Sequence, residues 1–255
     1  MIKFVDNHCH INSLSERSFL KNTEGFLFVD SSIDYESSCL SLEISSQNNF
    51  VYSCLGFHPL KGELFKEEIL NSYEDLIVKY QKKIIGIGEI GLDYKANIRV
   101  DMQIKIFSSF LKLAKKYKLP VVIHNRWHDF LILEILDRYF DSYEKIIFHC
   151  FSQDFSFLEK ILEKRGMVSF SLNLLRKKKL VSLLREVPLE NLLLETDSPY
   201  MFLENKPSTP LDIEKIYIFV AQKRNIDLKD LSLKILSNFK KVYNLNIQNE
   251  SGNCF

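Results

Sequence analysis

Short apolar runs rich in Val, Ile, Leu and Phe alternate along the whole chain with longer amphipathic segments. Such runs are typical of strands buried on both faces of a parallel sheet, and the segments between them are typical of helices that cover the sheet. The predicted strands are 2–8, 26–30, 50–55, 84–89, 120–124, 145–149, 166–170 and 191–196.

The segments between these strands have the apolar spacing of helices. In 99–118, for example, Ile104, Phe107, Leu111 and Ala114 recur on one helical face. The predicted helices are 34–47, 63–82, 99–118, 127–140, 154–164, 173–186, 210–224 and 228–243. Asp227 precedes the last of them and is its predicted N-cap.

Eight strands, each followed by a helix, predict a single (β/α)8 TIM barrel in the α/β class. The alternative is a doubly wound open sheet, which usually carries a glycine-rich nucleotide loop after its first strand. Neither GxGxxG nor GxxxxGK[ST] follows the run 2–8, so the barrel is preferred. Without a repeat or linker-like stretch, we expect one domain over 1–245 and a frayed polar tail at 246–255.

Composition and charge indicate where the protein works more clearly than what it does. The chain has 255 residues, of which 46% are hydrophobic and 26% charged, as in ordinary soluble globular proteins. Its formal net charge of +1 gives no electrostatic argument for nucleic acid or for an acidic membrane, so phosphates would need local charge or bound metal. Its five scattered cysteines favour reduced thiols, and no apolar run reaches the ~20 residues of a membrane helix. We therefore expect a cytoplasmic protein.

Histidines gather where a barrel enzyme has its active site, at the C-terminal ends of the strands. Of the six histidines, five follow predicted strands: His8, His10, His58, His124 and His149. His8 and His10 are two positions apart and point the same way from a strand. Two imidazoles side by side gain little without an ion between them. His8, His10, His124 and His149 are therefore predicted metal ligands.

Two carboxylates end otherwise apolar strands. Because an isolated buried charge is very costly, Glu89 and Asp197 must face the barrel mouth or be paired. Glu195 shares the face of Asp197 and is a candidate partner for the ligands. His58 is open to three interpretations: a ligand, a substrate contact or a loop residue. His128 starts a helix and is interpreted as structural or as a rim contact.

Four histidines and two carboxylates are more ligands than one tetrahedral ion binds, and their number suits two ions. Mixed nitrogen and oxygen ligands fit Zn²⁺, Mn²⁺ or Fe, or Mg²⁺ with waters completing its shell. Two ions ~3.5–4 Å apart can activate a water, which is hydrolytic chemistry. Cys9 and Cys150 neighbour these ligands, but alternation turns them to the opposite face, so both are predicted to be buried apolar residues.

Six ordered motifs and a closing helix carry a family resemblance. They lie at 6–10, 56–59, 87–94, 122–126, 149–152, 195–200 and 238–243. By these motifs the chain resembles the TatD family of metal-dependent deoxyribonucleases, TIM-barrel members of the amidohydrolase superfamily.

The resemblance implies a role for each candidate ligand. His8, His10 and Asp197 would hold one divalent ion, and His124 and His149 the other. Glu89 would bridge the two ions. An activated water would attack the phosphorus of a phosphodiester, with Asp197 as proton acceptor, so that Glu89 and Asp197 are the catalytic candidates. The ions would be Mg²⁺, Mn²⁺ or Zn²⁺.

Substrate contacts follow from the same resemblance. His58 and Tyr94 would lie on the substrate side. Arg126, on the same face as His124, is a candidate for holding a phosphate, since guanidinium matches phosphate geometry; the alternative is a salt bridge on the rim.

The chain departs from the family pattern in two loops. Gln153 stands where glycine is usual, and the segment 206–210 replaces a frequent Arg-Asn-x-Pro segment. The basic run 176–179 follows the seventh predicted strand. It is either a contact for a nucleic-acid backbone or a solvated helix face.

We expect a hydrolase that cleaves the phosphodiester bonds of single-stranded DNA. Exonuclease action is one form that this activity could take. The alternative keeps the fold and metals but acts on D-aminoacyl-tRNA esters or on another amidohydrolase-type substrate. A third hypothesis is a barrel without chemistry that serves as an interaction module. The oligomeric state is left open, a monomer included.

Overall fold

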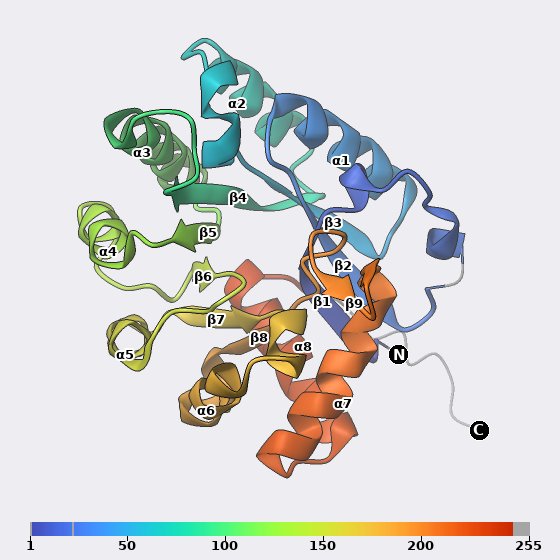
Figure 1. Ribbon diagram of the computed structural model, residues 1–255. Helices are drawn as coiled ribbons and strands as arrows, with labels where there is room; N and C mark the ends of the chain where they lie inside the picture. Colours follow the sequence, from blue (N-terminus) through green and yellow to red (C-terminus); the bar gives the residue numbers. More distant parts are fainter. Residues whose placement is uncertain (1, 22, 247–255) are drawn as a thin grey trace.

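The structure is a computed structural model that describes residues 2–21 and 23–246 (Figure 1). Eight parallel strands form one sheet in consecutive order, and each buries apolar side chains. The strands are β1 (Phe4–Cys9), β2 (Phe26–Ser31), β3 (Val51–Leu55), β4 (Ile84–Asp93), β5 (Val121–Arg126), β6 (Ile146–Phe148), β7 (Met167–Phe170) and β8 (Leu192–Leu194). The strand order excludes the doubly wound alternative, in which strands that neighbour in sequence are separated in the sheet.

Polar contacts link the last strand to the first. The backbone N–H of Asp197 donates to the His8 carbonyl at 3.0 Å, and that of His10 donates to the Ser198 carbonyl at 2.7 Å. Below them, the Asp6 carboxylate accepts hydrogen bonds from the Thr196 N–H at 2.9 Å and from its hydroxyl at 2.6 Å. The sheet is a nearly closed barrel, and the predicted (β/α)8 fold is confirmed.

Helices surround the strands (Figure 1). They are α1 (Tyr35–Gln47), α2 (Ile69–Lys79), α3 (Val100–Tyr117), α4 (Asp129–Asp137), α5 (Phe155–Glu163), α6 (Lys178–Glu186), α7 (Ile213–Arg224) and α8 (Leu228–Tyr243). Asp227 caps α8 as predicted, because its side chain accepts from the Lys229 N–H at 2.8 Å. In the described residues, no helix has both the length and the apolar character needed to cross a bilayer.

Several boundaries differ from the prediction, four of them at elements next to the site. β4 continues past residue 89 to Asp93, and β8 ends at Leu194, before its carboxylates. The predicted helices 63–82 and 173–186 are each divided into a 3-10 turn, η3 (Pro59–Leu64) or η4 (Leu172–Leu175), followed by a shorter α-helix. The short β9 (Phe202–Leu203) and β10 (Lys206–Pro207) form a hairpin between β8 and α7. Of the predicted frayed tail, all but Asn246 lies outside the described residues.

The amino ends of the strands are covered by α8. Its Asn238 amide donates to the Leu192 carbonyl at 2.8 Å, and its Ser232 hydroxyl donates to the Lys3 carbonyl. Phe239 and Val242 of the same helix belong to the apolar core. The opposite end, where the strands finish, therefore carries the cavity.

Candidate metal centre

His8 and His10 lie at the carboxyl end of β1 and present their Nε2 atoms to each other at 3.1 Å. Both rings are oriented by Ser31 at the end of β2. The Nδ1–H of His10 donates to the Ser31 carbonyl at 2.9 Å, and Nδ1 of His8 lies 3.0 Å from the Ser31 hydroxyl. Both rings are buried, so this arrangement is fixed by the protein and not by water.

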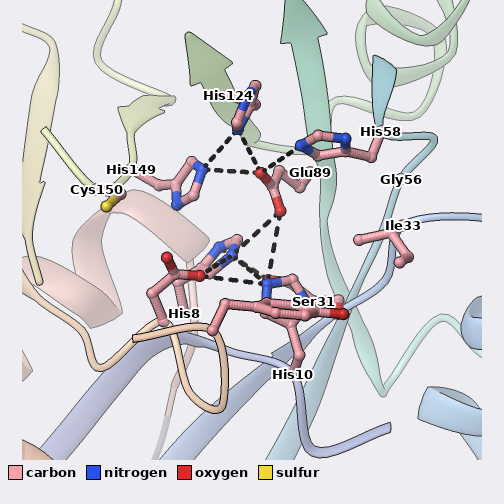
Figure 2. Close-up of polar contacts among 12 residues, drawn as sticks. His8, His10, Ser31, Ile33, Gly56, His58, Glu89, His124, His149 and Cys150 are labelled. Carbon is pink, nitrogen blue, oxygen red and sulfur yellow. Dashed lines mark hydrogen bonds and ion pairs between the residues drawn. The ribbon is translucent and has the colours of Figure 1, made fainter. Parts of the chain in front are cut away.

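Glu89 of β4 joins this pair to a second group of imidazoles (Figure 2). Its Oε2 lies 3.5 Å from Nε2 of His8 and 3.6 Å from Nε2 of His10. Its Oε1 faces three imidazole nitrogens: Nδ1 of His124 at 2.6 Å, Nε2 of His149 at 2.9 Å and Nε2 of His58 at 3.2 Å. One carboxylate thus presents one oxygen to each group.

Asp197 completes the first group from the turn after β8. Its Oδ1 lies 3.4 Å from Nε2 of His10 and 3.9 Å from Nε2 of His8. The backbone of Asp197 is left-handed, with φ at 55°, and its N–H bond to the His8 carbonyl holds that turn against β1. Side chains from both ends of the sequence therefore converge on one point.

Asp93 belongs to the centre and was not among the predicted site residues. Its Oδ2 lies 3.0 Å from Nε2 of His124, and Lys95 donates its N–H to Oδ1 at 2.8 Å. Because β4 continues to Asp93, Glu89 and Asp93 lie four positions apart on the same strand. Ending the predicted strand at 89 concealed this; continuing the alternation of strand side chains through Gly91 would have found it.

The donor atoms of the first group fit a cation. Because a carbonyl only accepts, His10 carries its proton on Nδ1 and its neutral Nε2 offers a lone pair. That lone pair faces Nε2 of His8 and an oxygen of Asp197. A cation is the species that such converging lone pairs stabilise, and nitrogen with carboxylate oxygen suits Zn²⁺ or Mn²⁺.

The second group has the same character. A carboxylate of Asp93 faces Nε2 of His124, which places the proton of the neutral ring there and leaves Nδ1 bare toward Glu89 at 2.6 Å. Three clusters of side chains are each compact enough to hold an ion: His8 with His10 and Asp197, His8 with Glu89 and His149, and His58 with Asp93 and His124.

Without an ion, the imidazoles must stabilise the carboxylates as charged partners. Burial alone would raise the pKa of Glu89, but the charges of His149 and His58 hold it well below its usual range. Burial likewise opposes ionisation of Asp197, yet the hydrogen bond from His10 lowers its pKa. Burial lowers the pKa of His8, whose charged form would also be repelled by His149. Glu89 and Asp197 are therefore anionic, as metal ligands must be.

Glu195 supports His149 as expected of a partner behind a ligand. Its Oε1 accepts the Cys150 N–H at 2.6 Å and lies 3.3 Å from Nδ1 of His149. The two cysteines differ from each other. Cys9 is fully buried and its thiol lies 3.4 Å from the Val29 carbonyl, as predicted. Cys150 lies after the end of β6, so strand alternation does not apply to it and it lines the cavity, contrary to the prediction.

The centre opens into a cavity of about 910 Å³. Arg126 lines it, with Nη1 3.7 Å from Oδ2 of Asp93. Gln153 also lines it, and its amide donates to the Asn125 carbonyl at 2.9 Å, so this departure from the family pattern links two loops of the rim. Tyr94 does not line the cavity and instead contacts Trp127, with ring centroids 5.4 Å apart.

The sequence model of a family described as TatD related DNase matches residues 5–244, a range that includes every side chain of the centre. The chain belongs to this family. The fold of this family and the cluster of metal-ligand side chains described above therefore occur in one chain. The chain is a metal-dependent hydrolase.

Similar proteins match nearly the full length of the chain. An archaeal relative, the uncharacterized metal-dependent hydrolase MJ1582 of Methanocaldococcus jannaschii, is 27% identical, with 95% of this chain and 97% of the relative covered. The uncharacterized metal-dependent hydrolase YabD of Bacillus subtilis is 25% identical, with 94% and 99% covered. Among solved structures, the TatD homologue YjjV of Escherichia coli is 24% identical with a TM-score of 0.88, covering 95% of this chain and 98% of its own.

Proposed function

We propose that this TatD-family hydrolase cleaves phosphodiester bonds of single-stranded DNA with the help of two divalent ions. The observation that carries the proposal is Glu89, whose two oxygens face separate groups of imidazoles. That arrangement suits a carboxylate shared by two cations. The family description, TatD related DNase, supports DNA as the substrate.

The proposed ligands of one ion are His8, His10 and Asp197, and those of the other are His124 and His149, with Glu89 between them. Bound divalent ions would lower the pKa of a water and neutralise charge on the phosphate. Asp197, anionic and at the edge of the cavity, would accept the proton of the attacking water. Its carboxylate is free to accept a proton because the hydrogen bond from His10 and the charge of His149 lower its pKa and keep it ionised before the ions bind.

Arg126 would bind a non-bridging oxygen of the phosphate. Its guanidinium lines the cavity and is 44% exposed, so it keeps donors free beyond its 3.7 Å contact with Asp93. His58 lies 3.2 Å from Glu89 and would steady the bridging carboxylate from the substrate side. The N–H donors of the Arg126 guanidinium form a planar fork, which matches the geometry of phosphate oxygens.

A screen of Mg²⁺, Mn²⁺ and Zn²⁺ on single strands labelled at the 5′ or the 3′ end tests the proposal. The parent chain should shorten the strand with at least one ion, and Glu89→Ala should lose about 100-fold or more in rate. Glu43→Ala is the matched control, since Glu43 is exposed on α1 and outside the cavity. Equal cleavage by Glu89→Ala, or none with any ion, would refute the proposal. Faster release of D-amino acid from charged tRNA would favour the alternative substrate.

A further inference from the structure

Trp127, the single tryptophan of the chain, lies on the rim of the cavity between β5 and α4. Its side chain is 81% exposed and its backbone is left-handed, with φ at 68°. Exposing an indole forgoes the free energy of burying it, and a bulky residue at positive φ is strained. Strain of this kind gathers at sites that clamp ligands. The fold therefore holds this ring out at the mouth of the metal centre at a cost.

Two other aromatic rings accompany it. Phe130, on the first turn of α4, is 68% exposed and lines the same cavity. The Tyr94 ring packs against Trp127 at a centroid distance of 5.4 Å and an interplanar angle of 49°. We call Trp127, Phe130 and Tyr94 the aromatic platform. A cluster of exposed rings at one edge of a cavity is a surface for a flat ligand.

Two lysines also bring positive charge to the cavity. Lys177 lines it from the N-cap position of α6 and Lys179 from the first turn of that helix, and both are exposed. They lie at the N-terminal end of α6, where positive charge opposes the helix dipole and the first turn of the helix has no acidic residue. Asp129 and Asp154 share this part of the rim and interact electrostatically with Lys179. Lys177 forms no ion pair with any residue that the structure describes.

Flat rings beside cations match one class of ligand. A nucleobase stacks on an aromatic ring whatever its sequence, while the phosphate next to it pairs with lysine or arginine. An apolar protein partner would use the rings but leave the lysines unpaired. The composition of the rim, which also includes Arg126 3.7 Å from Asp93 of the metal centre, therefore favours a single nucleic-acid strand.

We propose that a base of the bound strand stacks on Trp127 of the aromatic platform, while Lys177, in the lining of the same cavity, binds a phosphate of the same strand. This deepens the proposed function and rests on it for the identity of the strand. The strand would then lie between the β5–α4 and β7–α6 turns, with one phosphate at Arg126 and the metal centre. The basic run 176–179 thus contributes one binding residue, Lys177, and not a general basic face.

Intrinsic fluorescence tests the stacking directly, because every tryptophan signal comes from Trp127. The full chain is titrated in EDTA, which keeps the strand intact, with a short oligothymidylate and with an abasic strand of equal length and charge. Saturable quenching by the first and none by the second is the expected result. The titration is repeated with an RNA strand of the same length. The strand that binds with the lower Kd identifies the preferred backbone.

Variants test the same contact without the fluorophore. Trp127→Asn removes the ring but tolerates left-handed backbone, and Trp127→Phe keeps a ring. Anisotropy of a labelled strand should show about tenfold or greater weakening for Trp127→Asn and for Lys177→Ala, with Trp127→Phe within about threefold of the parent. Leu233→Ala and Lys229→Ala are the controls, since both residues are exposed on α8, away from the cavity. During cleavage, Trp127→Asn should raise KM with little change in kcat.

Equal quenching by the abasic strand, or parent-like binding by Trp127→Asn, would overturn the platform even if the protein cleaves DNA. Conversely, quenching without cleavage under any ion would support the platform and refute the proposed function. The two proposals therefore fail separately.

Discussion

Ser31 orients both histidines of β1 with two different atoms. Its carbonyl accepts the Nδ1–H of His10, and its hydroxyl lies 3.0 Å from Nδ1 of His8. Both Nε2 atoms are thereby directed to the same point. A single small residue on the neighbouring strand thus decides which nitrogen each ring offers to a metal.

Ser31→Ala should lower the affinity for the first divalent ion about 10- to 100-fold, because the His8 ring loses its partner while the backbone contact to His10 remains. Titration with Mn²⁺ or Zn²⁺ measures the effect. Ser45→Ala is the control, since the Ser45 hydroxyl is buried but bonds within α1 and to Ser53. Unchanged affinity in Ser31→Ala would contradict this role.

Asp30 lies fully buried behind Ser31, and its Oδ1 accepts two bonds from Asn12 while its Oδ2 has no hydrogen-bond partner. Burial raises the pKa of Asp30 to about 6. The folded chain therefore holds a proton that the unfolded chain releases near pH 4. The free energy of unfolding contributed by this group is full below pH 4 and falls as the pH rises to about 6.

Asp30→Asn should remove that dependence, because an amide keeps both bonds from Asn12 and does not ionise. Relative to the parent, the variant should gain about 3 kcal/mol in free energy of unfolding between pH 4 and pH 7. Urea unfolding at several pH values in EDTA measures this difference. A difference that stays constant with pH would be inconsistent with a buried, titrating Asp30.

At the scale of elements, strand ends carry the candidate site. Alternation in the sequence sufficed to place His8 and His10 on one face and to bring Glu89 and His124 to the same mouth. It failed where the predicted strand ends were wrong. β4 continues four residues past Glu89 to Asp93. β6 stops at Phe148, so the alternation of strand side chains does not extend to Cys150.

The rim was less predictable than the barrel for a physical reason. Strands are specified by apolar runs that many residues share, whereas a loop residue such as Trp127 or Gln153 takes its position from a few contacts across the mouth. Tyr94 was expected on the substrate side; its ring contacts Trp127 on the rim but does not itself line the cavity. The sequence left the basic run 176–179 as either a nucleic-acid contact or a solvated helix face, and the structure places Lys177 and Lys179 of that run in the cavity lining.

Gly91 sets the spacing of β4 against β5. It pairs with His124 in the sheet, its φ is 152°, and a Cβ there would overlap the His124 carbonyl oxygen. Gly91→Ala should destabilise the fold by about 3 kcal/mol or more and displace His124. Gly62→Ala should cost less than Gly91→Ala, because its Cβ would meet side-chain atoms of Ile98, which can turn away, and no backbone atom. Chemical unfolding compares the two, and similar costs would contradict this view of β4.

At the scale of the whole molecule, the barrel concentrates function at one end. α8 covers the amino ends of the strands, and contacts between β1 and the turn after β8 hold His8 and Asp197 together at the other end. The net charge of +1 does not show that positive side chains lie at this end of the barrel. Arg126 and Lys177, which we propose bind phosphates, both line the cavity. Location in the cell remains a prediction from cysteine usage.

Everything proposed for catalysis depends on Glu89 joining two groups of donors into one centre. Elemental analysis after reconstitution with Zn²⁺ or Mn²⁺ and removal of free ions measures this most directly. The parent chain should retain two ions per molecule, and Glu89→Gln, which keeps the shape but loses the charge, should retain one or none. One ion or fewer in the parent, or two ions in Glu89→Gln, would contradict the paired centre.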